Sequence, residues 1–221
     1  MLFSSIPFLY YFLPLVLAVY FLVPRGLKNA VLFASSLLFY AWGEPRFCLF
    51  MLLSILQGYV FGRLIEKNAE NRKWSKIFLT ASVLLSLGLL GYCKYADFFI
   101  SSVNAVTGLS LKLLHVALPI GISFYTFQIL SYVVDVYRGD VPAQKSFLKL
   151  GTYIAMFPQL IAGPIVRYVD VAAQIESRES DPENVFRGVP RFCVGLGKKV
   201  LLADHVGQVA DQLLGGSFTG A

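Results

Sequence analysis

The sequence has few charged residues for a chain of 221 residues. Asp, Glu, Lys and Arg make up 14% of it, whereas soluble globular domains contain about 25%. Hydrophobic residues make up 57%, and the mean hydropathy is +0.66. This composition argues against a water-soluble enzyme, and the aromatic content of 15% excludes an intrinsically disordered chain. We therefore expect an integral membrane protein made of helices, because the apolar runs are too long for barrel strands.

Cysteine and histidine are also scarce. The three cysteines, Cys48, Cys93 and Cys193, are widely separated and form no CxxC pair. This spacing indicates neither a disulfide framework nor a zinc site. His115 and His205 have no candidate nucleophile near them in the sequence. We expect both to be interfacial or solvated, and we predict no metal site and no bound cofactor.

Positive charge is absent before the first apolar run, 8–23, and is concentrated in short loops after it. The net charge of +6 comes largely from loops at 25–28, 63–76 and 138–149. In membrane proteins such loops face the cytoplasm. The distribution predicts a multi-pass protein in the bilayer with its N-terminus outside, and it does not indicate a nucleic-acid partner. The predicted topology depends most on the short second run, 29–42, because every later segment would have the opposite orientation if this run did not cross the membrane.

Apolar runs predict the transmembrane helices, and prolines predict where they break. The runs are 8–23, 29–42, 47–65, 77–95, 119–137 and 148–165. The second run stops at Gly43-Glu44-Pro45, and the last contains Phe157-Pro158 and Gly163-Pro164, which favours a broken or re-entrant helix. Residues 96–118 are less apolar, so we expect them to lie along the membrane interface. The expected fold is an all-α, polytopic transmembrane bundle with broken or re-entrant helices and interfacial amphipathic helices.

Small residues in the third run predict close helix packing. Gly58 and Gly62 have the small-xxx-small spacing that lets two helices approach each other.

Polar residues form a stripe on the helix predicted over 119–137. At helical spacing, one face carries Gly121, Phe124, Gln128, Ser131, Tyr132 and Asp135. Such a stripe must face protein or water rather than lipid. One interpretation is a helix that lines a substrate tunnel. The alternative is that Gln128 and Ser131 hydrogen-bond to neighbouring helices while Asp135 lies near Arg138.

The broken stretch 157–167 contributes two more polar residues, Gln159 and Arg167. Broken helices at membrane depth occur where the backbone lines a cavity or is buried in protein. The alternative is a kinked segment without a ligand role. The complete set of tunnel candidates is Gln128, Ser131, Tyr132, Asp135, Gln159 and Arg167.

Five blocks, in order, carry a resemblance to a known family. They are Met1–Phe8, Ser35–Pro45, Leu118–Gln128 together with Tyr132–Arg138, Phe157–Arg167 and Gly195–Asp204. With these blocks the chain resembles the membrane-bound O-acyltransferase family, in the alginate O-acetyltransferase-like branch of bacterial polysaccharide-acetylating enzymes.

The resemblance implies an enzyme of the bacterial inner membrane. Members pass an acyl group from a cytoplasmic thioester, such as acetyl-CoA, to hydroxyls of an exported polysaccharide such as alginate, with the help of periplasmic partner proteins. Their catalytic histidine lies downstream of these blocks, and neither His115 nor His205 has the matching context, so we assign no catalytic residue. We expect residues 1–221 to be the N-terminal part of one O-acyltransferase domain, truncated before the catalytic histidine region and inactive alone. The alternatives are a non-catalytic fragment or assembly subunit and a small-molecule transporter.

Overall fold

The computed structural model describes most of the chain, and every regular element in the described part is a helix. The described residues are 4–43, 45–114, 118–119, 121–160, 165–178 and 182–215. The chain divides into two compact units, residues 1–17 with 179–221 and residues 18–178.

The first unit joins the N-terminal helix to the C-terminal helices. Its elements are a π-helix at Pro7–Phe12, the beginning of α1 (Leu13–Leu22), α9 (Pro182–Gly197), a second π-helix at Lys198–Ala203, and α10 (Asp204–Gly215). Phe8 and Phe12 are buried in it. The Lys199 ammonium donates to the Ser4 hydroxyl at 2.9 Å and pairs with Asp204 at 3.0 Å, so one charged group ties the N-terminal segment to the C-terminal helices.

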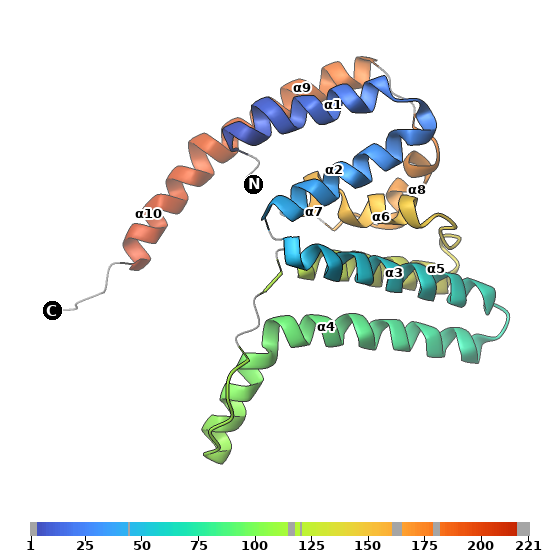
Figure 1. The fold of residues 1–221 in the computed structure, drawn as a ribbon, viewed down its shortest axis with the longest axis vertical. Helices are drawn as coiled ribbons and strands as arrows, with labels where there is room; N and C mark the ends of the chain where they lie inside the picture. The colour runs from blue at the N-terminus through green and yellow to red at the C-terminus, as the bar shows by residue number, and fades with distance from the viewer. Residues whose placement is uncertain are drawn as a thin grey trace. The chain divides into compact units, whose positions relative to one another are not determined.

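The second unit is a helical bundle around α3. Its elements are a short 3-10 helix at Arg25–Leu27, α2 (Lys28–Gly43), α3 (Pro45–Lys67), α4 (Arg72–Thr107), α5 (Ile122–Arg138), α6 (Phe147–Ala155), α7 (Phe157–Leu160) and α8 (Tyr168–Glu176). Helix α3 contacts α2, α4, α5 and α6, and Figure 1 shows it at the centre of this unit. By length and composition, α3 and α4 could each cross a bilayer.

Helix breaks occur where proline predicts them. Helix α2 ends at Gly43 and α3 begins at Pro45. The run 148–165 is broken at Met156, between α6 and α7. The predicted second break, at Gly163-Pro164, lies outside the described residues.

Helix α4 is longer than the apolar pattern predicts. We expected the helix to end at Tyr95, but it continues to Thr107 and stops at Gly108, which has a left-handed φ of 70°. The extra turns tolerate polar residues because several hydroxyls, such as those of Ser101 and Thr107, donate to carbonyls one turn earlier. The following segment folds back along the helix, where both amide atoms of Asn104 bond the backbone of Leu111 at 2.9 Å. Figure 1 shows that α4 itself bends.

The two glycines of α3 lie against α5, as their spacing predicts. A Cβ atom at Gly58 would lie 2.9 Å from Cγ2 of Ile129, and one at Gly62 would lie 2.8 Å from the hydroxyl of Tyr132. Neither position has room for a larger side chain. This close approach fixes where α5, the helix with the polar stripe, sits on α3.

A buried polar cluster joins α3 to α4 on another side. The Gln57 amide nitrogen donates to the Ser82 hydroxyl at 2.8 Å and to the Ser82 carbonyl at 3.1 Å. The Ser86 hydroxyl donates to the Gln57 carbonyl oxygen at 3.1 Å. Interhelical bonds of this kind satisfy polar groups that neither lipid nor a hydrophobic core can satisfy.

Candidate functional site

A groove of about 420 Å³ lies beside the C-terminal half of α5. We call it the α5 groove. Its lining is Phe127, Leu130, Ser131, Val134, Asp135, Arg138, Ile165 and Arg167. The wall is mostly apolar, and the charged groups come from the end of α5 and from the segment before α8. The structure therefore brings three of the six tunnel candidates, Ser131, Asp135 and Arg167, to one surface.

Two residues that line the α5 groove form an ion pair. The Arg167 guanidinium donates to Asp135 Oδ1 at 2.5 Å, and Asp140 Oδ2 lies 3.6 Å from the same nitrogen. The Asp135 side chain is 3% exposed, whereas that of Arg167 is 48% exposed. Burying a carboxylate is costly unless a cation compensates it, so Arg167 is the group that allows Asp135 to stay buried. Arg138, which the sequence places near Asp135, lines the same groove, and the ion-pair partner of Asp135 is Arg167, from a segment distant in the sequence.

Two polar residues of the α5 stripe bond within the protein. The Ser131 hydroxyl donates to the Gln128 carbonyl at 3.1 Å, within its own helix, and it also bonds the Tyr153 hydroxyl of the neighbouring helix α6. The Tyr132 hydroxyl accepts the backbone N–H of Gln144 at 2.9 Å and is fully buried. Tyr132 therefore anchors the loop after α5.

Three tunnel candidates keep a buried polar atom without a hydrogen-bond partner. These atoms are Gln128 Oε1, Asp135 Oδ2 and Gln159 Nε2. Buried polar groups are almost always paired, so each unpaired one needs an explanation, such as a water or a ligand. These atoms agree with the tunnel interpretation, and the assignment of these residues to a tunnel stays a prediction.

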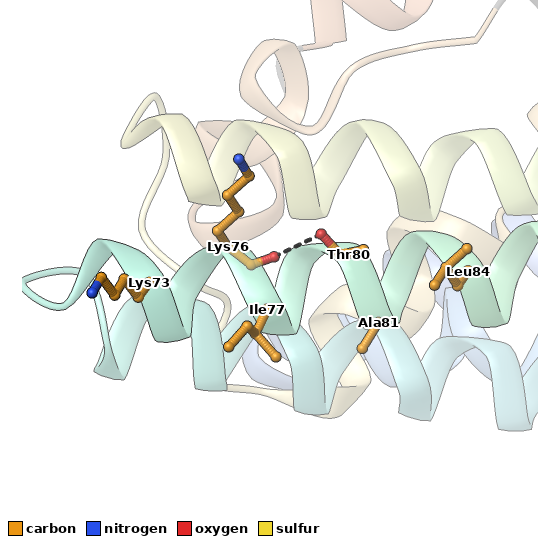
Figure 2. Close-up of a pocket in the computed structure, with 6 residues that line it drawn as sticks. All are labelled: Lys73, Lys76, Ile77, Thr80, Ala81 and Leu84. Carbon is orange, nitrogen blue, oxygen red and sulfur yellow. Dashed lines mark hydrogen bonds between the residues drawn. The ribbon is translucent and has the colours of Figure 1, made fainter.

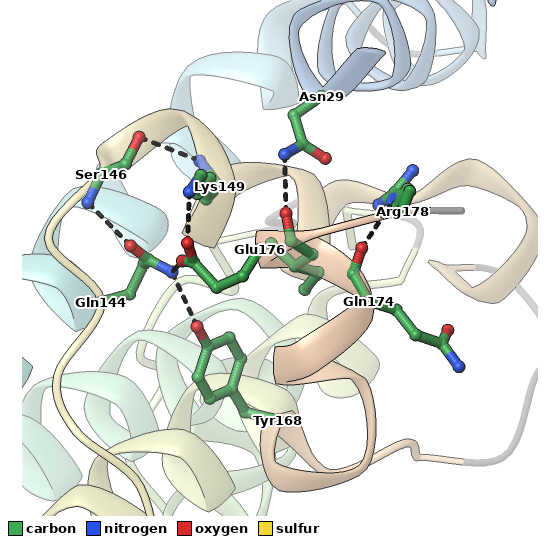
Figure 3. Close-up of polar contacts among 9 residues, drawn as sticks. Asn29, Gln144, Ser146, Lys149, Tyr168, Gln174, Glu176 and Arg178 are labelled. Carbon is green, nitrogen blue, oxygen red and sulfur yellow. Dashed lines mark hydrogen bonds and ion pairs between the residues drawn. The ribbon is translucent and has the colours of Figure 1, made fainter. Parts of the chain in front are cut away.

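A second polar network holds the loop between α5 and α6, and Figure 3 shows it. The Gln144 amide nitrogen donates to the Tyr168 hydroxyl and to Glu176 Oε1, both at 2.8 Å. The side-chain carbonyl oxygen of Gln144 accepts the backbone N–H of Ser146 at 3.0 Å. Lys149 pairs with Glu176 Oε2 at 2.5 Å. These bonds lower the pKa of Glu176, first through Lys149 and then through Gln144.

No sequence pattern signals this Gln144 network. Gln144 lies in a loop outside the apolar runs, and Tyr168 and Glu176 lie in a polar segment of mixed charge. Only folding brings the loop onto α8, where the ring of Tyr168 packs edge-on against Tyr132 and Tyr153 at 5.1 and 5.2 Å between centroids. The network thus links the loop between α5 and α6 to the packed rings of Tyr132, Tyr153 and Tyr168.

The histidines and cysteines form no recognisable centre in the described part of the chain. Within it, no group of three or more His, Cys, Asp or Glu residues is arranged to hold a metal ion. The ring of His205 lies near the Val200 carbonyl at 3.2 Å and is exposed. His115 lies outside the described residues.

Comparison with known proteins finds relatives named as alginate O-acetylases and as a peptidoglycan O-acetyltransferase. The chain is 40% identical over 215 residues to the probable alginate O-acetylase AlgI of Pseudomonas syringae pv. tomato and, at the same identity and length, to that of Pseudomonas putida. It is 28% identical over 243 residues to the peptidoglycan O-acetyltransferase of Helicobacter pylori. Each alignment covers 96% of this chain but only 42%, 44% and 46% of the respective relative.

No family model and no solved structure matches the chain significantly. The chain spans less than half the length of the relatives it matches, yet the match runs through nearly all of its own residues. This confirms the resemblance that the five sequence blocks predict. By sequence, the chain is therefore similar, over nearly all of its length, to proteins named as probable alginate O-acetylases.

Proposed function

We propose that the chain forms the membrane-embedded N-terminal part of an O-acyltransferase. The enzyme moves an acetyl group from a cytoplasmic thioester donor, such as acetyl-CoA, toward hydroxyls of an exported polysaccharide such as alginate. It works in the bacterial inner membrane with periplasmic partner proteins. The observation that carries this proposal is the similarity to probable alginate O-acetylases, 40% over 96% of the chain.

The proposed orientation places the basic end of the second unit in the cytoplasm and the N-terminus outside. Two of the basic loops touch each other, since the Arg72 guanidinium lies over the Tyr137 ring at 4.9 Å and Glu66 accepts the Ala143 N–H at 2.9 Å. The loop at 25–28 leads into Asn29, whose amide donates to the Ile175 carbonyl at 2.9 Å, next to the Gln144 network. Figure 1 places all three loops at one end of this unit. Basic loops gathered at one end agree with the positive-inside rule.

In this proposal the α5 groove and the buried polar atoms near it form part of the acyl path. An apolar wall suits an acyl chain, and a guanidinium with five N–H donors has donors left after it binds Asp135. In this proposal the catalytic base lies C-terminal to the five sequence blocks that carry the family resemblance. Without a base within about 2.6–3.2 Å of the acceptor hydroxyl, a factor of roughly 10²–10⁴ in rate is lost, so residues 1–221 alone are expected to be inactive.

A chimera tests the proposed activity. Residues 1–221 replace the matching segment of the Pseudomonas syringae relative in a strain that lacks its own alginate O-acetylase, and the acetyl content of the secreted alginate is measured. We expect acetylated alginate from the chimera and none from residues 1–221 alone. An unacetylated polymer from a chimera that is present in the membrane at the level of the intact relative would refute the proposal.

Orientation is tested separately by single cysteines in a background free of Cys48, Cys93 and Cys193. A cysteine at Asn68, in the most basic loop, should resist a membrane-impermeant maleimide in intact spheroplasts and react after lysis. Labelling at this position before lysis would contradict the proposed topology.

A further inference from the structure

The outward face of α4 carries a groove of about 610 Å³, which we call the α4 groove. Its lining is Lys73, Lys76, Ile77, Thr80, Ala81 and Leu84. These residues are mostly three or four apart, so they form one stripe along the helix. Figure 2 shows them spread along α4 from its lysine end to Leu84.

The stripe changes from basic to apolar along its length. Lys73 and Lys76 lie in the first turns of α4, whereas Ile77 and Leu84 are 53% and 66% exposed. The one hydroxyl in the lining, that of Thr80, donates to the Lys76 carbonyl at 2.9 Å and is thus satisfied within the helix. The groove therefore offers an apolar surface with two exposed lysines at one end, whose side chains point in different directions in Figure 2.

The opposite face of α4 is already occupied. Ser75, Ser82 and Ser86 are buried, and the last two bond Gln57 of α3. One face of α4 thus packs against the bundle, and the α4 groove lies on another face. From residue 73 to residue 84 the groove extends about 16 Å at 1.5 Å per residue, close to half of a hydrocarbon core of about 30 Å.

We propose that the α4 groove binds an anionic phospholipid of the cytoplasmic leaflet. The headgroup phosphate is held by the ammonium groups of Lys73 and Lys76, and an acyl chain lies over Ile77, Ala81 and Leu84. The charge is complementary, because anionic headgroups attract lysines at the membrane surface. The apolar part of the stripe, from Ile77 to Leu84, is about 10 Å long at 1.5 Å per residue and covers part of the acyl chain of one leaflet. This inference rests on the membrane location in the proposed function.

Lipid binding is measured by native mass spectrometry of the detergent-solubilised chain titrated with phosphatidylglycerol. In the variant Lys73→Gln/Lys76→Gln we expect the affinity to fall about 30-fold, from about 1 kcal/mol per lysine at 1.4 kcal/mol per tenfold change. The matched control is Lys94→Gln/Lys112→Gln, which removes the same charge outside the groove and should leave the affinity within about threefold of the parent. Binding of phosphatidylcholine with the same chains should be weak in all forms.

Equal phosphatidylglycerol affinity in the two double variants would overturn the inference. The occupant is identified by a photoreactive benzoylphenylalanine at Ile77 in membranes that contain the full-length chimera. A crosslink to lipid supports the inference, whereas a crosslink to protein shows that another helix covers the groove and overturns it.

The inference and the proposed function can fail separately. Release of the chain from membranes by alkaline carbonate would remove the membrane location and refute both. Loss of alginate acetylation in the chimera, with selective lipid binding intact, refutes the acyltransferase proposal alone. Loss of selective lipid binding with acetylation intact refutes the lipid site alone.

Discussion

Replacing Gly62 with alanine tests the packing that positions α5 on α3. The new Cβ would lie 2.8 Å from the Tyr132 hydroxyl, 2.9 Å from Cε1 and 3.1 Å from Cζ. Tyr132 cannot easily retreat, because its hydroxyl accepts the Gln144 N–H and its ring packs on Tyr168. Overpacking of this kind costs about 1–3 kcal/mol. Alanine gains about 0.5–1 kcal/mol over glycine inside a helix, and the steric cost exceeds that gain.

The matched control is Gly88→Ala in α4, where a Cβ would meet nothing within 4 Å. This variant should gain the helical preference of alanine and unfold at a slightly higher temperature than the parent. The two variants should therefore differ by about 1–3 kcal/mol, and each kcal/mol moves the Tm by about 2–4 °C in a chain of this size. Thermal unfolding in detergent, followed by circular dichroism, measures the difference.

The cause of the loss is tested by combining Gly62→Ala with Tyr132→Phe. Removing the hydroxyl removes the shortest of the three contacts, so alanine at position 62 should cost less when Tyr132 is replaced by phenylalanine. A Gly62→Ala variant as stable as Gly88→Ala, or a cost unchanged by Tyr132→Phe, would refute the packing argument.

Two ion pairs give further predictions. Arg167→Gln leaves the buried Asp135 carboxylate without its cation and should lower the Tm clearly more than Arg187→Gln, which breaks a pair exposed on both sides; equal Tm values for the two variants would contradict this reasoning. The pair of Lys149 with Glu176 lowers the pKa of that carboxyl from its ordinary 4.5. Its stabilising effect, about 0.5–1 kcal/mol, is complete above the ordinary pKa and is lost as the pH falls through the lowered pKa. The Glu176→Gln variant should lack this acid-side loss, and an identical pH profile of unfolding in both forms would show that the pair does not stabilise the fold.

The local elements could be predicted from the sequence because short-range rules determine them. Proline places the start of α3, and the glycine pair of α3 indicates a close helix contact without identifying the partner helix. The end of α4 was predicted too early, at Tyr95, because hydropathy indicates which residues are apolar and not where a helix stops. Hydroxyls such as that of Ser101 bond within the helix and let it continue through a polar stretch.

The candidate site was predictable only in part. The polar stripe on α5 is visible in the sequence, because a fixed helical period places Gln128, Tyr132 and Asp135 near one another. The pairing of Asp135 with Arg167 is a contact between residues 32 positions apart, and no local rule reports such contacts. The same holds for Gln144, whose partners come from separate segments of the chain.

The most direct test of the central claim follows the acetyl group itself. Inside-out membrane vesicles that contain the chimera and its periplasmic partner proteins, with alginate in the lumen, receive acetyl-CoA labelled in the acetyl group from outside. The account predicts label covalently bound to luminal alginate, released as acetate by mild alkali, and much less label with the Arg167→Gln chimera. Label that enters the lumen without becoming bound to the polymer would contradict acyl transfer and would identify a transporter.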